Sequence, residues 1–424
     1  MKTNKKLLTN VAMILIAGFA AVTLTSCPAE HGNKLEMTCI KPNTQNVSNR
    51  PKVVITLENS MSMKGYVPEK NKIEFPNMTF ESHVGDLVSK LNNCDFSTQW
   101  QCGNKKGKTT LDLYNNGIKD GAIFSEGDTP LEKYIKQVGE QANDTTVSIF
   151  VSDMIFSISR MQGNPNAIKN SLPKLQTLVK DALRPLAKNQ IHLLLIQYTS
   201  DFNGKYYYNC TNNLTPCAFK QIVLHKRPYY FLVVGTQDNL NSLLETNVFP
   251  KYEKIWATFT LNDGDFTAQD VVTESNNYWY VDPKGDPSLT FNYIAMADFE
   301  GQQTNVDLSF SALNERAFLS AWQPTSHSHA IANMQKLSDS EIKVNFIAYN
   351  QLADYEEVTI SLVSERADWK NCSTDNDIIS ADESAQLEGK TWSFDKLMEA
   401  FSDVYPNIIK PETVGSFSFT LLKE

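Results

Sequence analysis

One apolar run that ends in polar side chains does most to limit the folds open to this chain. Residues 53–57 are aliphatic or β-branched, as in a strand that is buried on both faces. Glu58, Ser60 and Ser62 follow at alternate positions, where such a strand would break into a loop. Ligands of open α/β sheets bind at the carboxyl ends of the strands, so this loop is a candidate binding site. A carboxylate and two hydroxyls are the hard oxygen ligands that a divalent cation prefers.

Strand-like and helix-like segments alternate from residue 51 to residue 250. Short apolar segments rich in branched or aromatic residues predict strands at 53–57, 146–151, 191–198 and 229–234. Apolar residues at three- and four-residue spacing predict helices at 81–91, 131–141, 172–183 and 240–248. A turn-rich stretch at 94–113 predicts an antiparallel hairpin at the sheet's edge. We therefore expect an α/β fold with a doubly wound, mostly parallel sheet.

Two further polar residues belong to the same predicted edge. Thr129 lies just before the helix at 131–141, at its N-cap, and Asp153 follows the second buried strand. The ends of parallel strands and the start of the helix between them share one edge of a sheet. Each residue alone could simply cap a helix or satisfy a loop amide. Their joint position instead favours a shared site.

This part of the chain resembles a von Willebrand factor type A domain. The metal-ion-dependent adhesion site of that family combines an Asp-x-Ser-x-Ser loop, a Thr from a second loop and an Asp from a third. Ser60 and Ser62 match the serines, Thr129 the threonine and Asp153 the last acid, in the same order along the chain. The resemblance implies that Glu58, Ser60, Ser62, Thr129 and Asp153 bind Mg²⁺, with Mn²⁺ or Ca²⁺ as alternatives. It also implies a protein partner, whose acidic side chain would take the open coordination position.

Two residues depart from the family pattern. Glu58 stands where the family has Asp, so its carboxylate extends one methylene further. Met61 stands where bacterial members have a flexible Gly, which tolerates backbone angles that Met does not. An alternative therefore stays open, in which the chain keeps the fold of the family but binds no ion.

The N-terminal residues predict export. Lysines precede a largely apolar segment at residues 7–24, which reads as a secretory signal. The residues before Cys27 resemble a bacterial lipobox, which implies cleavage before Cys27 and attachment of lipids to it; the alternative is a plain signal peptide with an incidental cysteine. We expect a lipoprotein of the bacterial cell envelope, at the outer membrane, that contacts the membrane through its lipid anchor alone. The predicted divisions are a signal peptide (1–26), a tether (27–50), an α/β domain (51–250) and a β-rich domain (251–424).

The other six cysteines form an even set, which favours disulfides in an exported protein. The candidate pairs are Cys94 with Cys102, Cys210 with Cys217, and Cys39 with Cys372. Six cysteines allow fifteen pairings, so the connectivity stays open. Zinc is the alternative, but the chain has no C-x-x-C motif.

Residues 251–424 contain short, often alternating apolar segments, which predict a sandwich-like β domain with one helix at about 394–401.

The formal net charge of −9 disfavours nucleic acid as a partner. We expect no enzyme, because the nucleophile-elbow, phosphate-loop and zinc-protease motifs are missing from the sequence. The sequence thus predicts a partner-binding lipoprotein; the alternatives are a metal-free structural protein or, less favoured, a hydrolase with its site in the C-terminal half.

Overall fold

The protein is described from a computed structural model. The residues it describes are 33–39, 50–67, 77–126, 130–155, 165–207, 219–259, 267–273, 279–282, 293–296, 303–311, 322–338, 341–347, 355–364, 368–374, 387–409 and 412–423. The predicted signal peptide, Cys27, Thr129, Cys210 and Cys217 lie outside these ranges. Within them, no helix combines the length and the apolar character needed to cross a membrane.

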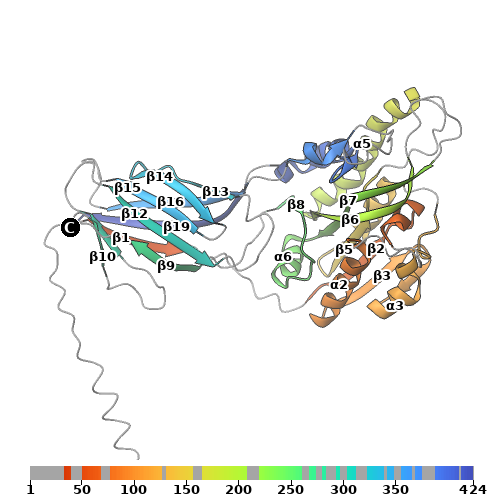
Figure 1. The fold of residues 1–424 in the computed structure, drawn as a ribbon, viewed down its shortest axis with the longest axis horizontal. Coiled ribbons are helices and arrows are strands. Elements are labelled where there is room, and N and C mark those ends of the chain that lie inside the picture. Colours follow the sequence, from red (N-terminus) through yellow and green to blue (C-terminus); the bar gives the residue numbers. More distant parts are fainter. Residues whose placement is uncertain are drawn as a thin grey trace, which may run out of the picture.

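A seven-stranded sheet forms the centre of the first unit (Figure 1). From edge to edge, its strands are β4 (Lys105–Gly107), β3 (Ser97–Cys102), β2 (Lys52–Leu57), β5 (Thr146–Ser152), β7 (Phe219–Gly235), β6 (His192–Tyr207) and β8 (Lys254–Ala257). The apolar run of the sequence is β2, which is central and parallel to both of its neighbours. The predicted hairpin is formed by β3 and β4 at one edge. The α/β class is therefore confirmed.

The sheet is mixed. Strands β2, β3, β5 and β6 run in one direction, but β7 lies between β5 and β6 and is antiparallel to both. Only 11 residues separate the end of β6 from the start of β7. A parallel neighbour requires a crossover of about a dozen residues or more, whereas antiparallel strands join through a hairpin. This short connection explains why the sheet is less parallel than a doubly wound fold.

Helices cover both faces of the sheet (Figure 1). One face packs on α2 (Phe80–Asn93), α3 (Thr110–Asn115) and α6 (Gln237–Glu245). The other packs on α4 (Leu131–Gln141), α5 (Pro165–Lys188) and α7 (Phe394–Val404). Successive side chains of β5 show the division, since Ile149 and Val151 join the first apolar cluster and Phe150 joins the second.

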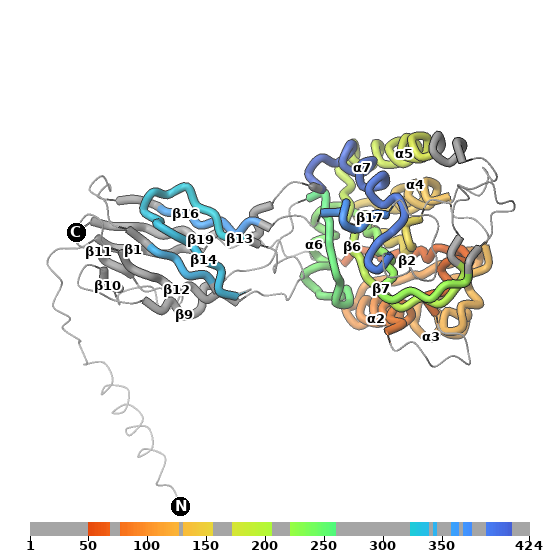
Figure 2. Tube along the Cα trace, turned by 45° about the horizontal axis from the view of Figure 1, so that its top comes forward, coloured from red at the N-terminus to blue at the C-terminus, as the bar shows by residue number. Residues whose placement is uncertain are grey.

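Helix α7 shows that the predicted domain boundary at 250/251 is wrong. The amide of Gln176 on α5 donates to the carbonyl of Lys396 (2.9 Å), and the Tyr405 hydroxyl donates to the carbonyl of Ile191 (2.7 Å). Figure 2 shows α7 beside α5. The chain therefore returns from the β-rich region to complete the α/β unit, and β8 also belongs to that unit.

The β-rich region consists of two antiparallel sheets. One has the order β10 (Trp279–Asp282), β11 (Tyr293–Met296), β1 (Asn33–Cys39), β19 (Glu412–Lys423), β16 (Tyr355–Ser364) and β13 (Trp322–Thr325). The other has the order β14 (Ile331–Ser338), β15 (Glu341–Ile347), β12 (Gln303–Ser311) and β9 (Thr267–Thr273). Buried aliphatic side chains of β15 and β16 belong to one apolar cluster, as in a sandwich. Because β1 pairs with β19, part of the predicted tether is in fact a strand of this region.

Two of the predicted disulfides are wrong. Cys94, Cys102 and Cys372 are free thiols. Cys94 directly follows α2, whereas Cys102 is the last residue of β3, so the length of that strand, at about 3.3 Å per residue, lies between them. The Cys372 sulfur lies 3.1 Å from Lys254 Nζ, in the α/β unit rather than beside β1. The pairing of Cys210 with Cys217 falls outside the described residues and stays a prediction.

Candidate functional site at the carboxyl edge of the sheet

The residues that follow β2 do come together. Glu58 is buried and accepts hydrogen bonds from the hydroxyls of Ser60 and Ser152, the latter at 2.5 Å. The Ser60 and Ser62 hydroxyl oxygens lie 2.7 Å apart. Since Ser60 donates its one hydrogen to Glu58, Ser62 is the donor to Ser60. One carboxylate and three hydroxyls thus form a connected cluster at the end of β2 and β5.

The departures from the family pattern have local explanations. The longer side chain of Glu58 places its carboxylate between a hydroxyl of its own loop and Ser152 of β5. Met61 begins the 3₁₀ helix η1 (Met61–Tyr66) and is not among the described residues with positive φ, so a glycine is not required there. The Met61 amide donates to the carbonyl of Glu126 (2.8 Å), which holds the loop against the neighbouring segment.

Asp153 faces a different partner. Its Oδ2 accepts from Nη2 of Arg227 at 2.7 Å, and its Oδ1 accepts from the Ile155 amide at 3.2 Å. The side chains of Asp153 and Arg227 are 2% and 4% exposed, so this is a buried ion pair. Met154 has a φ of +56°, which turns the chain sharply directly after the carboxylate.

Aromatic rings hold the guanidinium of Arg227. Its Cζ lies 3.9 Å from the centroid of the Phe202 ring and 5.1 Å from that of Tyr66. The Tyr66 hydroxyl donates to the carbonyl of Pro228 at 2.5 Å, which fixes the ring beside the arginine. Cation–π contact with desolvated rings favours the charged group in this buried place.

The described residues fit a divalent cation only in part. Glu58, Ser60 and Ser62 offer adjacent oxygen atoms, as Mg²⁺ prefers. Asp153 does not fit, because both of its oxygens already accept from protein donors. The described part of the chain also contains no group of three or more His, Cys, Asp or Glu that could hold a metal. A cation held as the resemblance implies would require Asp153 to leave Arg227.

Sequence reasoning missed Ser152 and Arg227. Ser152 directly precedes Asp153, and its hydroxyl belongs to the same strand end. Arg227 lies within β7, two residues before its apolar run at 229–234. A charged side chain is rarely buried at such a position unless it is paired. That position could have signalled a buried partner, but not which of the acids it would be.

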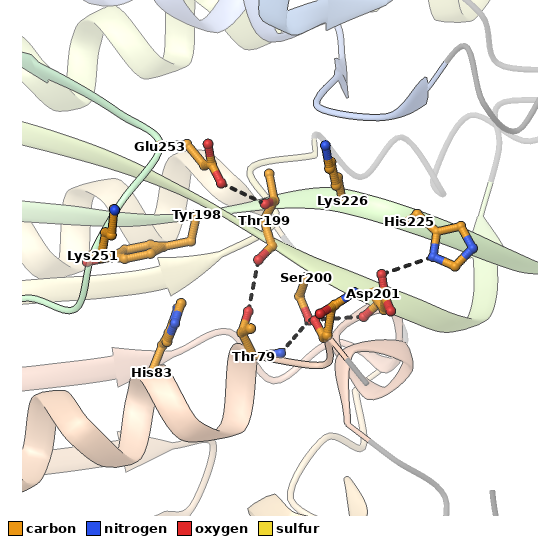
Figure 3. A pocket seen from close by; sticks show the side chains of 11 residues that line it. Thr79, His83, Tyr198, Thr199, Ser200, Asp201, His225, Lys226, Lys251 and Glu253 are labelled. Carbon is orange, nitrogen blue, oxygen red and sulfur yellow. Dashed lines mark hydrogen bonds and ion pairs between the residues drawn. The ribbon is translucent and has the colours of Figure 1, made fainter. Parts of the chain in front are cut away.

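A cavity of about 510 Å³ opens beside the Arg227 segment (Figure 3). It is lined by the start of α2, by residues 198–201 of β6, by His225 and Lys226 of β7, and by the segment before β8. The ladder between β6 and β7 shifts its register here, and Lys226 has a φ of +50°. This bulge brings two successive side chains of β7 to one cavity, although successive residues of a regular strand point to opposite faces.

Opposite charges balance within this cavity. Lys226 and Lys251 are matched by Glu253 and by buried Asp201, whose Oδ1 lies 3.1 Å from Nδ1 of His225. The size is that of a small-molecule site. Because the fixed charges cancel, charge alone selects no class of ligand.

His83 on the wall of the cavity gives a prediction for pH. Burial lowers the pKa of His83, so the folded protein favours the neutral imidazole, whose Nδ1 lies 2.6 Å from the Tyr229 hydroxyl. The unfolded state takes up the proton first as the pH falls through about 6.5, so stability is full above that pH and declines below it. We expect urea midpoints to fall from pH 7.5 to pH 5.5, with a smaller decline in His83→Gln. Equal declines in both proteins would contradict this role for His83.

A comparison with protein-family models finds no match, and comparisons with curated proteins and with solved structures find none either.

Proposed function

We propose that this protein is a lipid-anchored envelope protein that binds a protein partner at the carboxyl edge of its seven-stranded sheet. The observation that carries the proposal is the cluster of Glu58, Ser60, Ser62 and Ser152, which gathers two neighbouring strand ends into one polar site. Ser62 is partly exposed there, so a partner can reach the cluster from solvent. This edge is where ligands of α/β sheets bind.

The proposed binding does not require a resident cation. Asp153 is neutralised by Arg227, and Glu58 is satisfied by hydroxyls, so the cluster has polar contacts without one. A partner that donates or accepts hydrogen bonds would exchange them with Ser60 and Ser62. The Glu58 carboxylate is shared by the Ser60 and Ser152 hydroxyls and acts as an acceptor that orders the loop, so we propose binding rather than catalysis.

In-cell photocrosslinking tests this function. A photoreactive amino acid at Ser62 should give a discrete protein adduct, while the same group at Lys136, whose side chain is 67% exposed on α4, should give none. The Ser62 adduct should persist after treatment with a chelator and weaken when Ser60 is also changed to Ala. A folded protein that gives no adduct from Ser62 would refute the proposal.

Metabolic labelling with a fatty acid tests the proposed lipid anchor in the same cells. A label that disappears in Cys27→Ser would support the anchor, and an unchanged label would refute it.

A metal-free structural protein that binds through its β-rich region is the second candidate. The observation in its favour is the exposed Leu337, 47% accessible on β14. An adduct from a photoreactive group at Leu337, together with none at Ser62, would favour this candidate.

A further inference from the structure

We infer that Arg227 takes the place of a divalent cation at this edge of the sheet, and that removing its charge uncovers a cation site. The guanidinium neutralises Asp153 from within the chain. This inference concerns the charge balance of the site, so it stands whether or not a partner binds there.

Asp153 needs a positive charge nearby. A buried carboxylate without a counter-charge costs several kcal/mol. Among the described residues, Arg227 is its ion-pair partner, and the other donor to its carboxylate is the neutral amide of Ile155. The protein therefore meets the need with its own side chain.

The position of Arg227 is built into the fold. Its guanidinium lies against the rings of Phe202 and Tyr66, which themselves meet edge to face at 5.0 Å between centroids. A Cβ on Gly65 would lie 2.3 Å from the Phe202 ring, and one on Gly204 would lie 2.5 Å from the Gly65 Cα. Glycines at both positions therefore let η1 and β6 approach closely enough to enclose the arginine.

The two carboxylates of the site follow paired strands: the Glu58 amide donates to the Val151 carbonyl at the end of β5, and Ser152, which donates to the Glu58 carboxylate, directly precedes Asp153. Burial is the main reason why the pKa of Tyr66 lies far above its usual value; the charge of Arg227 lowers it, while Asp153 and Glu58 raise it. All three charged groups therefore act on the pKa of this one buried phenol. Without Arg227, Asp153 and the Glu58 cluster of three hydroxyls would offer oxygen atoms and excess negative charge, which together attract Mg²⁺ or Mn²⁺.

The experiment compares the response of wild type and Arg227→Met to metal. Methionine keeps an unbranched apolar stem but removes the charge. Wild type should melt at the same temperature in EDTA, MgCl₂ and MnCl₂. Arg227→Met should melt lower in EDTA and recover roughly 5–10 °C when Mn²⁺ is present at about 100 times its dissociation constant. Electron paramagnetic resonance should show about one Mn²⁺ bound to the variant.

Three variants serve as controls. Arg227→Lys keeps the positive charge and should show no metal response. Arg227→Met combined with Asp153→Asn removes the carboxylate and should lose the response. Arg184→Met changes an arginine whose side chain is 62% exposed and should behave as wild type.

Two results would overturn the inference. One is a metal response in Arg227→Met no larger than in wild type. The other is Mn²⁺ binding to wild type that disappears in the double variant Ser60→Ala and Ser62→Ala, since the ion would then bind beside the arginine. If Arg227→Met does not fold, the Mn²⁺ titration of wild type still tests the inference, because Mn²⁺ binding there that depends on Ser60 and Ser62 would contradict it. Loss of the Ser62 crosslink would bear on partner binding alone.

Discussion

Asp153→Ala is expected to lower the free energy of unfolding of the α/β unit by about 3–5 kcal/mol, the usual cost of leaving one member of a buried ion pair alone. The side chain of Arg227 is 4% exposed, so its charge cannot turn into water without disturbing Phe202 and Tyr66. Urea denaturation followed by aromatic fluorescence measures the change.

The control for Asp153→Ala is Asp181→Ala. Asp181 pairs with Arg184, and both side chains are more than half exposed, so its loss should cost less than about 1 kcal/mol. The double variant Asp153→Ala with Arg227→Met should be less destabilised than the sum of the two single variants, because no uncompensated charge remains. Additive losses would mean that the two side chains contribute independently.

Phe394→Ala is expected to cost about 3–5 kcal/mol, as do large-to-small changes of buried aromatic residues. Phe394 is fully buried, stacks on Tyr230 with 4.8 Å between ring centroids and packs on Trp256 at 5.6 Å. Both partners belong to the seven-stranded sheet, so the variant should destabilise the α/β unit although residue 394 lies far along the chain. The measurement is the urea transition of that unit.

Exposed Lys390 provides the control for Phe394, since Lys390→Ala lies in the same C-terminal segment and should change stability by less than about 0.5 kcal/mol. If Phe394→Ala left the transition of the α/β unit unchanged, helix α7 would not be part of its core.

The spacing of apolar residues correctly predicted helices and strands whose position is set by their own sequence. The helix at 131–141 has the bounds of α4, and the strands at 53–57 and 146–151 lie within β2 and β5. Periodicity suffices here because each element buries one continuous apolar surface. The convergence of Glu58, Ser60 and Ser62 at the end of β2 was also predictable, since the three are neighbours in sequence.

Pairings between distant residues were not predictable in this way. Arg227 reaches Asp153 across 74 positions, and β1 finds β19 at the other end of the chain. Periodicity shows that a segment is buried, but it does not show against what. The free thiols of Cys94 and Cys102 make the same point, because nearness in sequence does not bring two sulfurs together when a strand lies between them.

Strand β1 has a mechanical consequence. It is the first described element after the proposed anchor, and it is already extended between β11 and β19. A pull between the membrane and a partner held at the edge of β2 would pass along the backbone of β1 and then into β2, the next element of the chain. Because β1 is an interior strand of its sheet, such a pull would load its hydrogen-bonded ladders with β11 and β19 in shear, and those ladders would resist the extraction of β1.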